Sequence, residues 1–457
     1  MNSPHHLLIV GGGASGALLA LHLLKADKTD KWKITLTERN PEFGTGLAYG
    51  AHNNAHHLLN VRAKQLSCFA DQPNDFCNYL LEAGSNAGPD DFVPRRMFGD
   101  YVKNRLYKTA ESNKRLTFLQ DEISEVKPSE TDTEGYVCKT KSGSEINCSH
   151  LVLACGNLLP AAPAAATPDI LSHPAYEANP WNYSTFDNLN VNDNVVLIGS
   201  GLTMSDLVAE LNSRGHRGNI LSVSPHGFLP AQHQPPQPVW TGFGDELLNA
   251  KTLDAQIRIF RKQLRAAAEK NIGWTAVTDS LRPWLQQLWL ESDDEWRSNF
   301  MQHVRHIWGV ARHRLPPATA DVLYNSINCG QLKVAAGRIK AMNPEGNEMQ
   351  ISWMPRGTNK LQTITAAKVI NCTGPSSRWA DQGPELIKQL FADRQIAYDR
   401  SGLGLNALPG GELLNTEGQV QPRMFAIGPM IRGVLWEITA IPEIRAQAAA
   451  LAAKLTD

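Results

Sequence analysis

This sequence of 457 residues lacks the features that mark membrane, secreted or nucleic-acid-binding proteins. No apolar run reaches the ~18–20 residues that a membrane-spanning helix requires. The first apolar run, Leu7–Val10, leads directly into a glycine-rich turn, so we interpret it as a strand and not as a signal peptide. The 44 Lys and Arg nearly balance the 45 Asp and Glu, which leaves a net charge of −1. Such a balance gives no reason to expect nucleic acid or an anionic membrane as a partner.

The seven cysteines also exclude two classes of site. None of them forms C-x-x-C, and no cysteine/histidine cluster has the spacing of a zinc site. Disulfide reductases that work through a paired dithiol are therefore excluded, and we expect no metal. Cys155 and Cys372 end apolar strands, so reduced thiols in a cytoplasmic protein are the simplest interpretation.

Two glycine-rich motifs are the strongest positive signal. The first, LLIVGGGASG, places Gly11, Gly13 and Gly16 in the spacing G-x-G-x-x-G, between an apolar strand and a helical pattern from Ser15 to about Lys25. In this motif the first glycine allows a tight turn, the second lets a pyrophosphate approach the backbone, and the third lets helix and strand pack closely. The helix N-terminus, including Ala14 and Ser15, would face the phosphates.

An acidic residue indicates which dinucleotide this first site prefers. A strand at 33–37 leads to Glu38, about 20 residues after the last glycine, where an acid that binds ribose hydroxyls is expected. Such an acid favours FAD or NAD and disfavours the 2′-phosphate of NADP. Arg39 could contact adenine or a phosphate, or lie on the surface as a solvated side chain.

The second motif, VVLIGSGLTM, predicts a second nucleotide site at Gly199, Gly201 and Thr203. Met204 stands where the third glycine is expected, so helix and strand should pack less closely there. The segment after the next strand carries His226 but no arginine that could bind a 2′-phosphate. The choice between NADPH and NADH therefore stays open.

The order of these patterns predicts an α/β protein with two Rossmann-like, glutathione-reductase-like dinucleotide-binding domains. We expect a discontinuous first domain over 1–175 and 366–457, and a second domain over 190–365 with a helical insertion at about 242–323. A final helix is expected from about Trp436.

The chain resembles the bacterial FAD/NAD(P)-binding flavoproteins that are related to the flavin N-hydroxylating monooxygenases. The resemblance is carried by IVGGGASG, TERNPEFGTGLAYG, HHLLNVRAKQLSCFADQPNDF, LVLACGN, VVLIGSGLTMSD, VARHRLPP, VINCTGP and FAIGPMIRGVLWEITAIPEIR, in that order. Besides the two motifs, it implies cofactor contacts at Tyr49, Leu59, Asn60, Val61, Val126, Ala154, Gly156, Gly374, Gly428 and Ile438. The last two would belong to a segment that points a helix N-terminus at the flavin, unless that helix only packs.

A cluster of cations, HVRHIWGVARHRLPP, contains Arg312, His313 and Arg314 as candidates for binding an anionic substrate or a nicotinamide phosphate. A solvated helix end is the alternative. The leading hypothesis is an FAD-dependent monooxygenase that uses NADPH or NADH and oxygen on a small polar substrate, either nitrogen-containing or anionic. A flavin reductase or dehydrogenase with another acceptor, and a non-catalytic FAD-binding protein, are the alternatives. The catalytic residues, the substrate and the oligomeric state are not determined by the sequence.

Overall fold

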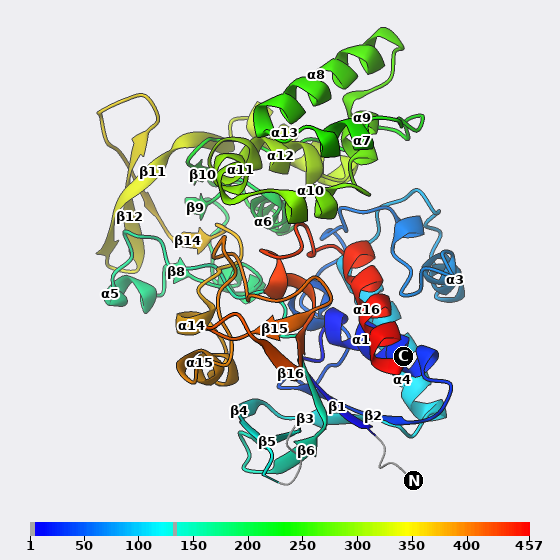
Figure 1. The fold of residues 1–457 in the computed structure, drawn as a ribbon. Coiled ribbons are helices and arrows are strands. Elements are labelled where there is room, and N and C mark those ends of the chain that lie inside the picture. Colours follow the sequence, from blue (N-terminus) through cyan, green and yellow to red (C-terminus); the bar gives the residue numbers. More distant parts are fainter. Residues whose placement is uncertain (1–4, 131–134) are drawn as a thin grey trace.

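The computed structural model describes residues 5–130 and 135–457, which form two mainly parallel sheets, one small antiparallel sheet and a helical layer (Figure 1). The first sheet has the strand order β15-β16-β7-β1-β2-β3 and is parallel except at β15. Its strands are β1 (His5–Val10), β2 (Trp32–Glu38), β3 (Leu116–Gln120), β7 (His150–Leu153), β15 (Glu412–Leu414) and β16 (Val420–Ala426). The antiparallel sheet β4-β5-β6 (Ile123–Pro128, Tyr136–Thr140, Glu145–Cys148) lies between β3 and β7 in the chain.

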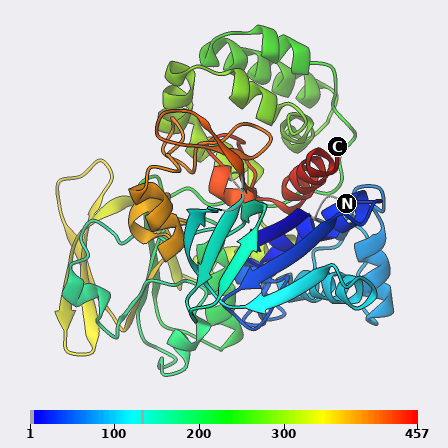
Figure 2. The ribbon, with the colours of Figure 1, turned by 60° about the horizontal axis from the view of Figure 1, so that its bottom comes forward.

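The second sheet has the order β13-β12-β11-β10-β9-β14-β8. Its strands are β8 (Tyr176–Glu177), β9 (Val195–Ile198), β10 (Ile220–Ser224), β11 (Leu332–Glu345), β12 (Glu348–Pro355), β13 (Gln362–Ala366) and β14 (Lys368–Asn371). The long β11–β12 hairpin projects from one side of the molecule (Figure 2). The chain thus leaves the first sheet after β7, forms the second sheet, and returns with β15 and β16.

Helices complete both units. Those of the first unit are α1 (Ala14–Ala26), α2 (Gly46–Tyr49), η1 (Ala63–Gln65), α3 (Asp75–Glu82), α4 (Arg95–Ser112), α14 (Trp379–Gln382), α15 (Glu385–Ala392), η4 (Gly428–Ile431) and α16 (Ile441–Thr456). The second contains α5 (Pro168–Leu171), η2 (Tyr183–Phe186), α6 (Leu202–Ser213) and α13 (Pro317–Asn328). A separate helical layer holds α7 (Gly244–Asn249), α8 (Leu253–Glu269), α9 (Trp274–Ser280), α10 (Leu285–Glu291), α11 (Asp294–Asn299), the π-helical turn η3 (Phe300–Val304) and α12 (Arg305–Arg312).

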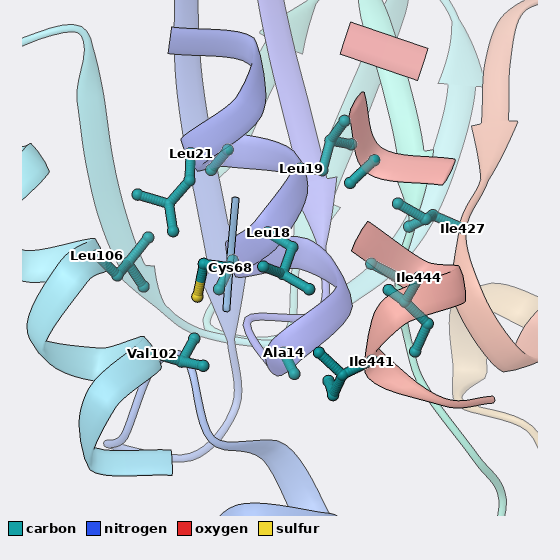
Figure 3. Close-up of a cluster of buried hydrophobic side chains, with 14 of the residues drawn as sticks. Ala14, Leu18, Leu19, Leu21, Cys68, Val102, Leu106, Ile427, Ile441 and Ile444 are labelled. Carbon is teal, nitrogen blue, oxygen red and sulfur yellow. The ribbon is translucent and has the colours of Figure 1, made fainter. Parts of the chain in front are cut away.

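Helix α1 lies at the centre of the first unit's core, between α4 and α16 (Figure 3). Its sequence ASGALLALHLLKA is mostly apolar, and all residues from Ala14 to Leu24 are buried, including Ser15 and His22. Leu18 and Leu19 pack in one cluster with Ile441 and Ile444 of α16. Each such buried leucine or isoleucine contributes about 1.5–3 kcal/mol, so this packing fixes the start of α1 relative to the C-terminal helix.

Three of the expected boundaries need correction. β14 and β8 pair in the second sheet and α5 packs on it, so that unit begins by 168 and extends to 371, beyond the limits of 190 and 365 set from the sequence. The helical insertion ends at Arg312 and not near 323, because α13 packs on α6 and β11 as part of the second Rossmann unit. The last helix begins at Ile441 and not at Trp436, because Glu437 has a left-handed backbone (φ 63°) that no helix can continue.

None of the helices in the described ranges, 5–130 and 135–457, combines the length and the apolarity that crossing a membrane requires.

Candidate functional site

A cavity of about 1230 Å³ lies at the carboxyl edge of the first sheet. Its walls include residues that directly follow β1, β2 and β7, together with parts of the C-terminal segment. Ligands of open α/β sheets bind at this edge, outside the carboxyl ends of the strands. Nine of the residues predicted from the sequence line it: Gly11, Gly13, Ala14, Ser15, Glu38, Arg39, Tyr49, Ala154 and Gly156.

The first glycine motif forms a tight turn from β1 into α1. Gly11 has φ 110°, and a Cβ atom placed there would lie 2.4 Å from the carbonyl oxygen of Ala154, so no other residue fits. Helix α1 begins after Gly13 without a side-chain cap. The first amides of an uncapped helix are donors that need partners, and the helix dipole favours an anionic one.

Glu38 lies at the end of β2 beside this turn. Its Oε2 accepts a hydrogen bond from the Gly12 amide (3.0 Å), and its Oε1 accepts two from Asn40, through the backbone amide (3.1 Å) and Nδ2 (3.0 Å). A carboxylate oxygen can accept more than one hydrogen bond, so Glu38 can also accept from the hydroxyls of a ribose. The position matches the one expected from the sequence.

The segment 45–52 forms the wall opposite the glycine turn, and its contribution beyond Tyr49 was missed by sequence reasoning. Gly46 lies over Gly13, since a Cβ at Gly13 would be 3.3 Å from the Gly46 Cα. The Tyr49 ring packs edge-on against Phe98, and burial raises the pKa of its hydroxyl. His52 also lines the cavity, and burial lowers its pKa, which favours the neutral imidazole. The glycines in GTGLAYG were the available signal for a close backbone approach.

The C-terminal segment closes the cavity through Pro429, Thr439, Ile441 and Ile444. Gly428 precedes them with φ 75°, and a Cβ there would lie 2.6 Å from the Oγ of Ser15. Its amide donates to Oε1 of Gln447 in α16 (2.8 Å). Ile441 is the first residue of α16, so the N-terminus of this helix borders the cavity, five residues later than Trp436.

The other predicted contacts of the first unit lie outside the cavity lining. Leu59 and Val61 pack in the core, and the Asn60 carbonyl accepts a hydrogen bond from Nε2 of His233 (3.0 Å). Both backbone groups of Val126 are bonded to the Gln389 side chain. Gly16 packs against the Gly11 carbonyl and Gly428 against the Ser15 side chain, so both support the glycine turn. Ile438 is fully buried in the core. Gly374 lies in the second sheet's region, three residues after the end of β14.

The second glycine motif repeats the geometry of the first. Gly199 has φ 120°, and a Cβ there would lie 2.5 Å from the carbonyl oxygen of Cys372. The same close approach occurs in the first motif, between Gly11 and the carbonyl oxygen of Ala154. Helix α6 begins after Gly201 without a side-chain cap, the space above Gly201 is open, and Thr203 lies in the first turn. Met204 is fully buried in the core of this unit. The Met204 side chain at the position of the third glycine is therefore accommodated in the core. The turn at Gly199 and the uncapped N-terminus of α6 have the same geometry as in the first motif.

Two arginines of the cation cluster form ion pairs within the protein. Arg312 donates to Oε2 of Glu437 (2.8 Å), whose other oxygen accepts from Nε1 of Trp308 (2.6 Å). Arg314 is buried and paired with Asp279. Burial lowers the pKa of His313. The two arginines proposed as substrate ligands thus hold the helical layer together and fix it to the segment that borders the cavity.

The two units are joined by polar contacts along α6. Arg95 of α4 pairs with Asp206 (2.9 Å). Glu210 accepts hydrogen bonds from His56 (2.6 Å), Asn54 (2.9 Å) and Arg214 (2.6 Å). Although burial opposes it, these hydrogen bonds and the nearby imidazole of His57, with Nε2 at 3.3 Å, hold the pKa of Glu210 well below its usual value.

His56, His57 and Glu210 have the residue types of a metal site, but the hydrogen bonds do not favour one. Nδ1 of His57 accepts from the backbone amide of Asn54 (3.0 Å), which places the imidazole proton on Nε2, facing the Glu210 carboxylate at 3.3 Å. A protonated nitrogen is a donor and not a metal ligand. The cluster is a buried hydrogen-bond network that fixes the segment after Tyr49 to the second unit.

Comparison with known proteins places this site in context. Residues 8–158 match the sequence model of a family described as FAD-NAD(P)-binding. A search of curated proteins finds no match.

Among solved structures, the chain is similar over nearly its whole length to hydroxylases and monooxygenases of amino acids. Ornithine hydroxylase PvdA from Pseudomonas aeruginosa is 14% identical with a TM-score of 0.67, over 99% of both chains. Ornithine N-hydroxylase KtzI from Kutzneria sp. 744, solved with reduced FAD, NADP+ and L-ornithine, is 12% identical with a TM-score of 0.67, again over 99% of both. L-lysine 6-monooxygenase from Pseudomonas syringae is 15% identical with a TM-score of 0.66 over 99% of both. At these identities the likeness shows the fold, which confirms the α/β architecture with two Rossmann-like units.

Proposed function

We propose that this protein is an FAD-dependent monooxygenase that uses NADPH or NADH to hydroxylate a small polar substrate. The observation that carries the proposal is the cavity, whose walls combine an uncapped helix N-terminus, the Glu38 carboxylate and the start of a second helix. The match of residues 8–158 to an FAD-NAD(P)-binding family supports the same assignment.

The residues present fit FAD. The amides at the start of α1 would bind the pyrophosphate, Glu38 would bind the ribose, and Arg39 would lie near the adenine. Thr45–Tyr49 and the segment from Thr439 to Ile444 would enclose the flavin end. The positive N-terminus of α16 favours negative charge, which is the charge of reduced flavin.

The second glycine motif would bind the nicotinamide nucleotide. Contacts from the first unit hold the two nucleotide sites in one orientation: His233 donates to Asn60 O, and Nη2 of Arg62 donates to Gln234 O (3.0 Å). When bound, the flavin supplies hydride acceptance and oxygen activation. The protein's own contribution is to orient both nucleotides and to exclude water from the reacting atoms. Overall, substrate, O2, NAD(P)H and H+ would give hydroxylated substrate, water and NAD(P)+.

A nitrogen-containing substrate is favoured by the structural neighbours, because the three proteins named above act on ornithine or lysine. Each of those substrates carries a primary amine that accepts an oxygen atom. The proposal for this chain is therefore hydroxylation of a small amine.

The test is to measure aerobic NADPH and NADH oxidation by the FAD-loaded protein in the presence of a panel of amino acids and diamines. We expect hydroxylated product to accumulate in proportion to the nicotinamide consumed, as quantified by mass spectrometry. The Gly13→Val variant, which should purify without flavin, is the matched control. If oxygen were reduced only to peroxide with every substrate, or if quinones were reduced instead, the monooxygenase assignment would be wrong and a reductase would replace it.

A further inference from the structure

Two histidines and two arginines lie near the carboxyl end of β10, beside the second glycine motif. His226 follows β10 by two residues, and its Nδ1 lies 3.3 Å from Nη1 of Arg356, which directly follows β12. The His306 ring of α12 lies 4.4 Å from the His226 ring, and Arg305 precedes it in the chain. Three elements far apart in sequence therefore bring positive or protonatable groups to one place.

The hydrogen bonds orient this cluster toward a ligand. Because a guanidinium can only donate, Nδ1 of His226 accepts from Arg356, and Nε2 then carries the ring proton as a free donor. Phe228 stacks on the His226 ring at 5.3 Å and 14°, which fixes the plane of the imidazole.

In the part of the chain that the structure describes, these four side chains, His226, Arg305, His306 and Arg356, form no ion pair with a carboxylate, unlike the charged groups of a typical surface salt-bridge network. Burial is the main cause that lowers the pKa of His306, and the neighbouring Arg305 and His226 lower it further, so positive charges on these groups would repel one another. An anion bound among these groups would relieve that repulsion.

The position of the cluster identifies the anion. In a Rossmann unit the residue at the end of the second strand faces the adenosine ribose, and an acid there excludes a 2′-phosphate. In this unit β10 ends at Ser224, whose hydroxyl bonds to that of Ser200 (2.8 Å) in the glycine turn. The first unit has Glu38 at the corresponding place. The arginine that sequence analysis did not find after β10 is thus supplied by Arg356, from the end of β12.

We propose that His226, His306 and Arg356 bind the 2′-phosphate of NADP, so that the protein selects NADPH over NADH. This inference rests on the proposed function only in taking the second glycine motif as a nicotinamide-nucleotide site.

The test is isothermal titration of the FAD-loaded protein with adenosine 2′,5′-bisphosphate and with 5′-AMP, which differ only in the 2′-phosphate. We expect the bisphosphate to bind roughly tenfold to a hundredfold more tightly, as charge-assisted hydrogen bonds to a phosphate predict. Arg356→Ala should remove most of this difference and leave the affinity for 5′-AMP within about twofold. Arg356→Lys should keep part of the difference, because it retains the charge without the planar fork.

Arg258→Ala is the matched control, since it removes an arginine from the exposed face of α8. It should leave both affinities unchanged. Equal binding of the two nucleotides by the native protein, an equal loss of both in Arg356→Ala, or no binding of either would each overturn the proposal. Titration does not depend on turnover, so a protein that prefers the bisphosphate but hydroxylates no substrate would contradict the proposed function and leave this inference standing.

Discussion

Replacing Arg312 tests whether the cation cluster binds substrate or holds the helical layer on the C-terminal segment. The side chains of Arg312 and Glu437 are 13% and 6% exposed, and their ion pair of 2.8 Å is supplemented by Trp308. Arg312→Ala would leave the Glu437 carboxylate buried with only the indole donor. Breaking a buried pair in this way costs about 3–5 kcal/mol, so we expect the free energy of unfolding to fall by about 3 kcal/mol.

The assay is urea unfolding of the FAD-loaded protein at fixed flavin concentration, followed by tryptophan fluorescence. The Arg258–Asp254 pair, with side chains 71% and 80% exposed, is the matched control, and Arg258→Ala should cost less than about 0.5 kcal/mol. A double-mutant cycle with Glu437→Gln should give a coupling energy above about 1 kcal/mol. If Arg312→Ala were no more destabilising than Arg258→Ala and instead raised the KM for an anionic substrate, our structural interpretation of Arg312 would be wrong.

Three further predictions follow from the core and the first glycine turn. Gly13→Val should yield protein without yellow colour. A Cβ there would lie 3.3 Å from the Gly46 Cα, and a bulky side chain at this motif position keeps a pyrophosphate away from the backbone. Flavin absorbance of the purified protein checks this, and a fully flavinated variant would contradict the FAD assignment. Met204→Ala should lower the free energy of unfolding by about 2–5 kcal/mol in a denaturant titration, because Met204 is fully buried, whereas Met301→Ala on the partly exposed π-helical turn should cost less. Burial, assisted by the charges of Arg314 and Arg62, lowers the pKa of His233 to about 4, so between pH 6.5 and 4 the unfolded chain binds a proton that the native protein does not. Stability should therefore fall as the pH drops through this range, and His233→Gln should make the fall shallower; equal pH profiles would refute this.

Local sequence was sufficient to predict those parts of the structure that depend on residues close together in the chain. The turn after β1 follows from Gly11 and Gly13, and the burial of α1 follows from its continuous apolar sequence. Glu38 lies where the spacing predicts because a strand, a turn and a helix of ordinary length bring it there. The same rules located Gly199 and Gly201, although Met204 was read as a flaw and is in fact a packed core residue.

Contacts between distant segments were decided by the tertiary structure. Arg356 has no neighbour in the sequence that points to a nucleotide, and only the β10-β11-β12 pairing brings it to His226. Arg312 has the residue type of a substrate ligand, and only the fold supplies Glu437 as its partner. The end of the second unit at β14 likewise depends on pairing with β9 across more than 160 residues of chain.

The sequence by itself therefore determined the two dinucleotide turns and their flanking strands and helices, because backbone conformation and apolar periodicity are set by residues close in the chain. The tertiary structure decided which charges are paired, which residues reach the cavity and which side chains lie together beside the second glycine turn. Side chains acquire those roles only when long-range packing selects their neighbours and removes them from water.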